Sequence, residues 1–148
     1  MLIWLGLPGC GSSKELRGVS VPDDFSVRIQ RGACFGTCPT YDLLVQGSGR
    51  TILNGYRGLS YTGLYQKHLS RRDLRAMVQA IQEADFFAFE PRYDDTRISD
   101  LPTFTLEVVM DGQRHEVVDR YGAPETLEQL QTRLLELIDL ETGFDPVQ

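Results

Sequence analysis

The sequence predicts an α+β domain in which two helices pack on one face of an antiparallel sheet of about five strands. Alternating segments arranged as hairpins and two segments with helical spacing of apolar residues support this prediction. Their order is a three-strand meander, a helix, a two-strand hairpin and a second helix. Because hairpins give antiparallel pairing and each helix has one apolar stripe, the simplest burial places both helices on the same face.

The first half of the chain shows the alternation of apolar and polar residues that half-buried strands have. It occurs over residues 25–30 and again in a second run that includes Tyr41. The Gly-Ser-Gly sequence at 47–49 separates this second run from β-favouring residues 50–56. A hairpin is expected there, with glycine where a positive φ is needed. Residues 58–69 are expected to contain a short extended stretch.

A helix is predicted after the meander. Ser70 suits its amino-terminal cap, and Asp73 falls in the first turn. The apolar residues at helical spacing are Leu74, Met77, Val78 and Ile81. Residues 83–85 end the helix, and Pro91 begins a loop that runs to Leu101. The aromatic residues expected to enter the core between them are Phe86, Phe87 and Phe89.

The second half predicts a hairpin and a second helix. Residues 103–110 and 114–120 are the two strands, and the Asp-Gly pair at 111–112 suits a type I′ turn between them. Pro124 suits the first position of the helix, and residues 143–146 end it with Gly and Pro. The predicted buried stripe of this helix consists of Leu127, Leu130, Leu134, Leu137 and Ile138.

Length and composition predict one ordinary globular domain. The chain has 148 residues, 41% hydrophobic and 24% charged, with a formal net charge of −6. Nucleic-acid binding is not expected, because phosphate backbones are bound by clustered Lys and Arg. The one dense basic run is Arg71, Arg72 and Arg75, at the start of the first predicted helix. An anionic membrane surface would repel the bulk of this domain.

Three cysteines, Cys10, Cys34 and Cys38, leave one that differs in role from the other two. Residues 1–7 are apolar but too short to span a membrane. They lead into Leu-Pro-Gly-Cys, which resembles a bacterial lipobox and predicts lipidation at Cys10. The alternative is a frayed apolar tail with a free Cys10.

The chain divides into four parts on this interpretation. Residues 1–10 are a truncated signal and lipobox-like segment, and residues 11–24 are a polar tether rich in Gly, Ser and Pro. Residues 25–142 form the single α+β domain. Residues 143–148 are a tail.

Four motifs together resemble a bacterial family catalogued as domain of unknown function number 6438. They are Arg-Gly-Ala-Cys-Phe-Gly-Thr-Cys-Pro-Thr-Tyr at 31–41, Glu-Ala-Asp-Phe-Phe-Ala at 83–88, Ile-Ser-Asp-Leu-Pro at 98–102, and Asp-Arg-Tyr-Gly-Ala-Pro at 119–124. The resemblance extends from residue 27 to 138. It implies a secreted or lipid-anchored protein, and it implies no activity, substrate or catalytic residue.

Three interpretations remain for Cys34 and Cys38, which lie in a loop between two predicted strands. The first is a structural disulfide that closes a tight loop, in which Gly36 supplies backbone freedom. The second is a redox-active pair, although the helix that lowers thiol pKa in such pairs is replaced here by a strand. The third is copper or zinc binding with His68 and His115, since Cys-x3-Cys-Pro also resembles the motif of Sco-type copper chaperones.

Candidate ligand-binding residues are few. Tyr56, Tyr61 and Tyr65 recur among glycines and are a candidate aromatic platform, with packing on neighbouring strands as the alternative. Asp100, before Leu-Pro, is expected to hydrogen-bond the neighbouring backbone and shape the start of a strand. No nucleophile elbow, phosphate loop or zinc-protease helix occurs in the sequence.

The function expected from these observations is a non-enzymatic binding or interaction module of the cell envelope. It is expected on the periplasmic side, held at the membrane by a lipid on Cys10, or alternatively secreted. Its partner is another envelope component, and no cofactor is expected. The alternative is a thiol-redox or copper- or zinc-binding protein that uses Cys34 and Cys38.

Overall fold

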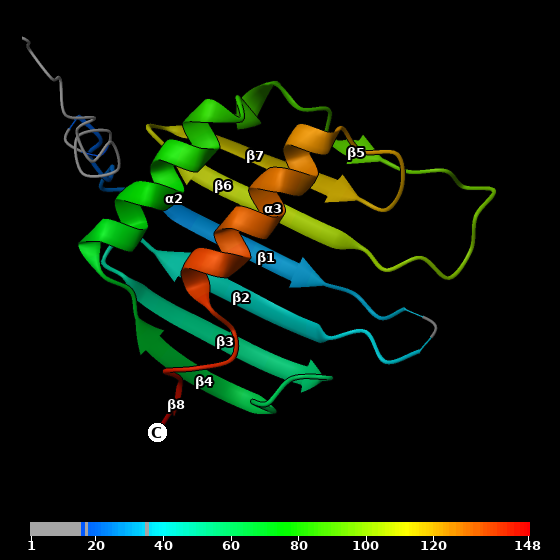
Figure 1. The fold of residues 1–148 in the computed structure, drawn as a ribbon, viewed down its shortest axis with the longest axis horizontal. Coiled ribbons are helices and arrows are strands. Elements are labelled where there is room, and N and C mark those ends of the chain that lie inside the picture. The colour runs from blue at the N-terminus through cyan, green and yellow to red at the C-terminus, as the bar shows by residue number, and fades with distance from the viewer. Residues whose placement is uncertain (1–15, 17, 35) are drawn as a thin grey trace, which may run out of the picture.

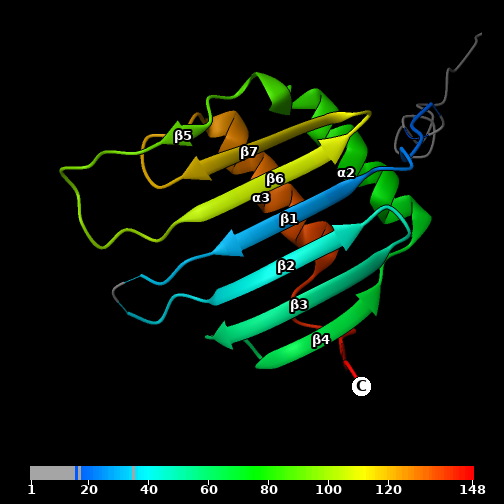
Figure 2. The same cartoon turned by 180° about the vertical axis from the view of Figure 1, so that it is seen from behind.

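The computed structural model describes residues 16, 18–34 and 36–148 of the chain. It has two layers (Figure 1): an eight-stranded sheet, and helices α2 (Arg71–Glu83) and α3 (Glu125–Ile138), both on one face of it. Seen from behind, the other face carries no helix among the described residues (Figure 2). No helix in this part of the chain is long and apolar enough to span a bilayer. The predicted α+β class with two helices is confirmed.

The order of the strands across the sheet is β5-β7-β6-β1-β2-β3-β4-β8. The β6–β7 hairpin therefore lies beside β1, on the side away from β2. A short 3-10 helix, η1 (Phe86–Ala88), follows α2. The strands are β1 (Ser26–Arg31), β2 (Thr40–Gln46), β3 (Arg50–Arg57), β4 (Gly63–His68), β5 (Arg92–Tyr93), β6 (Phe104–Met110), β7 (Gln113–Asp119) and β8 (Asp145–Pro146).

The prediction of about five antiparallel strands is wrong in two respects. The sheet has eight strands, and it is mixed because β5 runs parallel to β7. The stretch expected within residues 58–69 is β4, which pairs with β3 over six residues. The strands β5 and β8 were not predicted because two residues are too few to show a period. The segment expected as a tail contributes β8 and the buried Phe144.

The hydrophobic core lies between the sheet and the two helices. Alternate residues of the central strands face the helices and are buried, as their alternation predicted. The helices contribute Leu74, Met77, Val78 and Ile81 from α2 and Leu127, Leu130, Leu134 and Ile138 from α3. Leu137 was also predicted in the buried stripe but is only half-buried, because it lines a cavity between the two helices.

Caps and turns at the ends of the helices and strands are formed by local side-chain and backbone preferences. The hydroxyl of Ser70 accepts a hydrogen bond from the backbone N–H of Asp73, so the predicted cap of α2 is confirmed. Asp111 and Gly112 have φ angles of 52° and 76°, as a type I′ turn requires. Pro124 precedes α3 as an extended cap residue and is not its first helical residue.

We call one end of the sheet the loop end. There β1 and β7 finish, β6 begins, and the connecting segments 32–39, 94–103 and 120–124 lie (Figures 1 and 2). The backbone N–H of Gly32 donates to the carbonyl of Thr103 at 2.9 Å, which joins two of these segments.

The opposite end, which we call the tether end, is where residues 18–25 lead into β1. The carboxylate of Asp24 accepts hydrogen bonds from the backbone N–H groups of Asp111 and Gly112, at 2.9 and 2.8 Å. Since β1 has six residues, the tether joins the domain about 20 Å from the loop end.

Candidate functional site: a polar pocket at the loop end

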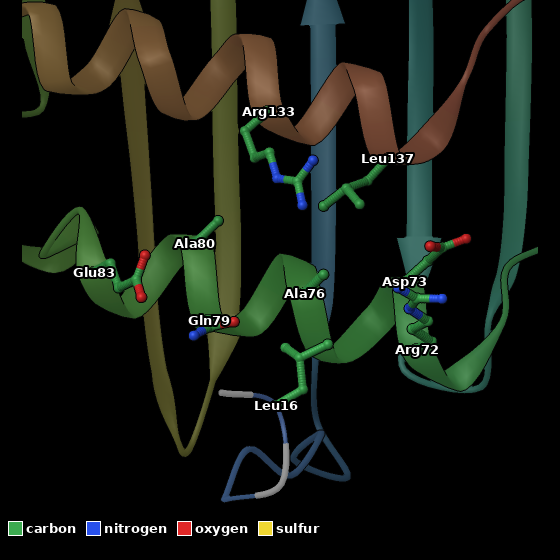
Figure 3. A pocket seen from close by; sticks show the side chains of 9 residues that line it. All are labelled: Leu16, Arg72, Asp73, Ala76, Gln79, Ala80, Glu83, Arg133 and Leu137. Atoms are coloured by element: carbon green, nitrogen blue, oxygen red, sulfur yellow. The ribbon is translucent and has the colours of Figure 1, made fainter. Parts of the chain in front are cut away.

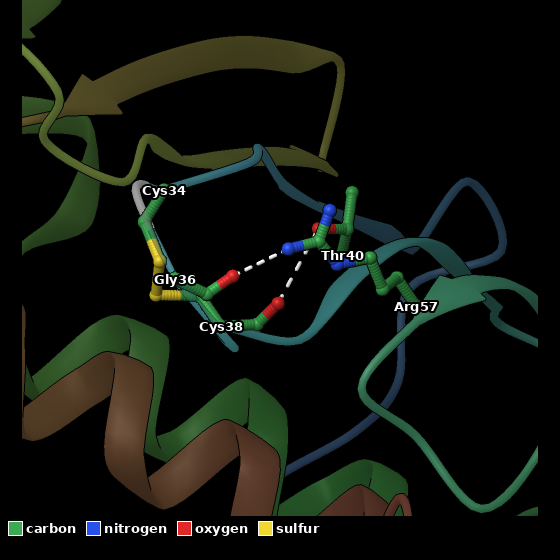
Figure 4. Close-up of a disulfide and its surroundings, with 5 residues drawn as sticks. All are labelled: Cys34, Gly36, Cys38, Thr40 and Arg57. Carbon is green, nitrogen blue, oxygen red and sulfur yellow. Dashed lines mark hydrogen bonds between the residues drawn. A yellow bond between two sulfur atoms is a disulfide. The ribbon is translucent and has the colours of Figure 1, made fainter.

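A disulfide between Cys34 and Cys38 closes the loop between β1 and β2, with their Cα atoms 5.8 Å apart. Gly36 inside the loop has a φ of 135°, which favours glycine at this position. Arg57, the last residue of β3, donates a hydrogen bond to the carbonyl oxygen of Gly36, and the Thr40 hydroxyl donates to that of Cys38 at 3.5 Å (Figure 4). The predicted disulfide is therefore present, and side chains at strand ends hold its loop.

The surroundings of this disulfide resemble those of a structural bond. Cys38 leads within two residues into β2, so the pair does not open a helix of its own as redox-active cysteine pairs usually do. Both cysteines are half-buried.

A polar cavity of about 450 Å³ lies at the loop end beside α3. Its floor is the last cross-strand row on the helix side of the sheet, in which Arg31 pairs with Phe104 and Phe104 pairs with Asp119. We call this cavity the loop-end pocket. The residues that line it are Arg31, Pro102, Phe104, Asp119, Arg120, Tyr121, Gly122, Glu128, Gln131 and Thr132.

Arg31 is the least satisfied charged group in this pocket. Its guanidinium carbon lies 5.5 Å from the centre of the Phe104 ring, a cation–π arrangement. Its Nε is buried and has no hydrogen-bond partner among the described residues. No ion pair found among these residues includes Arg31. A buried donor without an acceptor is unfavourable, and the positive charge of Arg31 lacks a counter-charge at the pocket that this residue lines.

The other arginine of the pocket is already paired. Nη1 of Arg120 lies 2.6 Å from Oδ1 of Asp94, and only 19% and 8% of these two side chains are exposed. Arg92 approaches the same carboxylate at 3.1 Å. Nη2 of Arg120 also donates to the carbonyl of Ile98 at 3.5 Å, so Arg120 holds the 94–103 segment against the end of β7.

The acidic side of the pocket is formed by β7 and α3. Oδ2 of Asp119 accepts a hydrogen bond of 2.8 Å from the amide of Gln131, which ties the end of β7 to the helix. Glu128 is exposed one turn earlier on α3 and also lines the pocket. Two carboxylates therefore face the cavity opposite Arg31.

Tyr41 lies beside Arg31 in the same cross-strand row. It is buried, and burial raises its pKa to about 12, although the positive charge of Arg31 opposes this shift. Its phenol therefore stays neutral below pH 10 and takes no part as an acid or base at physiological pH.

A comparison with known protein families shows which family this domain belongs to. The family described as domain of unknown function (DUF6438) matches residues 25–138. The chain belongs to the DUF6438 family. No curated protein matches the chain. In this DUF6438 domain, three of the four segments that carry the resemblance in sequence meet at the loop end, namely 31–41, 98–102 and 119–124.

The three predicted tyrosines do not form one platform in the DUF6438 domain. Tyr56 points to the open face of the sheet, where its hydroxyl donates to Asp42 at 2.8 Å, and this hydrogen bond raises the pKa of Tyr56. Tyr61 and Tyr65 instead pack together, 4.9 Å between ring centres, and Tyr61 also packs on Phe144 at 5.3 Å. The contact between Tyr61 and Tyr65 is of the kind that the alternative interpretation described, in which the tyrosines pack on their neighbours.

Asp100 lies in the 94–103 segment with a φ of 63° and is exposed. Its carboxylate accepts a hydrogen bond from the Ser99 hydroxyl at 3.3 Å. Asp100 is not among the residues that line the loop-end pocket.

The residues of the alternative metal site are far apart. His68 is the last residue of β4, at the tether end, whereas Cys34 and Cys38 are at the loop end. His115 is on β7, where its Nε2 lies 2.8 Å from the carbonyl oxygen of Phe89 and its ring packs on Phe86. In the described part of the chain, no three His, Cys, Asp or Glu side chains gather as metal ligands would.

Sequence reasoning missed the residues of the pocket itself, although one signal pointed to them. The alternation that buries Val27 and Ile29 continues to Arg31, and the alternation that buries Val117 continues to Asp119. A charged residue at a position where the period places a core residue marks a polar cavity or an ion pair.

A second cavity, of about 500 Å³, lies between α2 and α3 (Figure 3). The apolar residues of its lining are Ala76, Ala80, Leu137 and, from the tether, Leu16. The predicted lipidation site, Cys10, lies outside the described residues.

Proposed function

We propose that this protein is a non-enzymatic binding module of the bacterial cell envelope, attached to the membrane by a lipid on Cys10, which binds its partner at the loop end. The observation that carries the proposal is the loop-end pocket, in which the cation of Arg31 has no ion-pair partner among the described residues. A preformed cavity with a few unmatched polar groups is the usual form of a binding site.

The position of the tether supports this arrangement. Residues 18–25 join the sheet at the tether end, and Asp24 holds them there through the 111–112 turn. A lipid on Cys10 would therefore hold the tether end towards the membrane. The loop end, about a strand length away, would face a partner in the periplasm.

The anchor is tested in the native host with the full-length chain. Cells are grown with a labelled fatty acid, and the protein is extracted and partitioned between detergent and aqueous phases. The proposal predicts a labelled protein in the detergent phase for the wild type and an unlabelled aqueous protein for Cys10→Ala. A Cys10→Ala variant that stays labelled and in the detergent phase would contradict the anchor.

The binding end is tested by photo-crosslinking in intact cells. A photoreactive phenylalanine analogue replaces Tyr121, which is 51% exposed beside the pocket, or Gln113, which is exposed at the tether end as the matched control. We expect a specific crosslinked envelope component from position 121 and none from position 113. Equal crosslinking at both positions, or none at position 121, would contradict the proposal.

A further inference from the structure

We infer that the loop-end pocket binds the carboxylate group of a small monocarboxylate ligand, with Arg31 as its cationic partner. This inference rests on the proposed function, since it names the chemistry recognised at the same end of the domain. It goes beyond that proposal because it assigns a ligand class and one residue that recognises it.

The size of the cavity suits a small organic molecule. A volume of about 450 Å³ lies within the range of roughly 300–1,000 Å³ found for small-molecule sites. Pro102 gives the lining an apolar residue on which the carbon skeleton of a ligand can pack.

The unpaired cation in the pocket suits a ligand with oxygen acceptors. The guanidinium of Arg31 has N–H donors in one plane, and no ion pair found among the described residues includes it. The ring of Phe104 fixes this guanidinium by contact with its carbon at 5.5 Å. A planar, fixed guanidinium matches the two oxygens of a carboxylate, which accept parallel hydrogen bonds.

The charges around Arg31 disfavour a ligand with more than one negative charge. Arg120 is neutralised by Asp94 at 2.6 Å, so Arg31 is the one cation of the pocket that lacks a described counter-charge. Asp119 and Glu128 face the same space and repel anions. A monocarboxylate meets less of this repulsion than a phosphate group with nearly two charges.

The same features predict how Arg31 affects stability without ligand. Removing one partner of a buried polar contact usually destabilises a protein, but the Nε of Arg31 has no partner to lose. Met in its place keeps an apolar contact with Phe104 and removes a buried, unpaired donor. Arg31→Met is therefore expected to have an unchanged or higher Tm.

The test uses the full chain with its disulfide intact, titrated with N-acetylleucine, N-acetylleucinamide and inorganic phosphate. We expect saturable binding of N-acetylleucine by the wild type. The uncharged amide and phosphate should bind at least about tenfold more weakly, as expected for loss of a charged hydrogen-bonded pair. Arg31→Met should weaken N-acetylleucine binding by a similar factor. Arg114→Met, the matched control at an arginine outside the pocket, should bind it as tightly as the wild type.

The outcomes separate this inference from the proposed function. Equal binding of the acid and the amide, undiminished binding by Arg31→Met, or no binding of N-acetylleucine by the wild type would overturn the inference. If crosslinking at position 121 succeeds in any of these cases, the proposed function stands alone. If N-acetylleucine binds through Arg31 but crosslinking fails, the pocket is real and the envelope partner is wrong.

Discussion

Arg57, at the end of β3, donates a hydrogen bond to the carbonyl oxygen of Gly36 inside the disulfide loop, 21 residues earlier in the chain. This contact and the Cys34–Cys38 bond restrain one loop in two independent ways. The disulfide closes the loop, and Arg57 fixes the closed loop against the neighbouring strand. The loop end is therefore built from restrained connections around a polar cavity.

The disulfide is predicted to stabilise the fold moderately. In the chain-entropy model, closing so short a loop contributes about 2 kcal/mol, and Cys38→Ser should lower the free energy of unfolding by up to that amount in urea titrations. In the native protein both thiols should resist alkylation until a reductant is added. Thiols that react without reductant, or retained copper or zinc after dialysis, would favour the redox or metal alternative.

Asp24 is predicted to stabilise the tether end. Its carboxylate accepts two backbone hydrogen bonds from the 111–112 turn, so Asp24→Ala leaves two donors without their partner. We expect a loss of about 1–2 kcal/mol in the free energy of unfolding. Asp23→Ala is the control, because Asp23 is an exposed neighbour, and should change stability by less than about 0.5 kcal/mol. Equal effects of the two variants would contradict the role of Asp24.

Arg120 is predicted to hold the 94–103 segment in place. Arg120→Met removes the ion pair to Asp94 and leaves that largely buried carboxylate with Arg92. Trypsin should then cut after Arg97 faster than in the wild type, as measured by limited proteolysis and mass spectrometry. The control is Arg114→Met, which breaks a more exposed ion pair to Glu107 elsewhere on the sheet. Unchanged cutting in Arg120→Met would show that other contacts hold the segment.

The raised pKa of Tyr41 predicts that the folded protein loses stability at alkaline pH. Its pKa is about 12 in the folded protein and near 10 when exposed, so the folded state binds the phenolic proton more tightly. The stabilisation that arises from this pKa difference is fully present below pH 10 and is lost as the pH rises from 10 to 12. Urea titrations from pH 9 to pH 11.5 should show a steeper loss for the wild type than for Tyr41→Phe. Parallel curves would contradict the assignment.

Helices and strands whose apolar residues recur with a clear period were predictable from the sequence. The strands around Ile29 and Leu106 and the helix that begins after Ser70 appear where alternation or helical spacing placed them. The edge strands β5 and β8 were not predictable, because each is stabilised by pairing with a distant strand and has no local pattern. The position of the hairpin beside β1 also depends on contacts distant in sequence.

The candidate site was less predictable than the fold. The Cys34–Cys38 bond was one of three interpretations of two cysteines close in sequence, whereas the pocket needs Arg31, Asp119 and Gln131 from three elements. The roughly even spacing of Tyr56, Tyr61 and Tyr65 suggested a shared surface. Successive side chains of a strand point to opposite faces of the sheet. Tyr65 pairs with the core residue Leu53 and lies on the helix side, whereas Tyr56 points to the opposite face.

The central claim is that binding occurs at the loop end, through Arg31. Backbone amide shifts of the labelled chain, followed by NMR during titration with N-acetylleucine, test it most directly. The account predicts the largest shift changes at Phe104, Gln131 and Gly122, and their disappearance in Arg31→Met. Changes centred on Ala76 and Ala80, in the cavity between the helices, or an identical pattern in Arg31→Met, would contradict it.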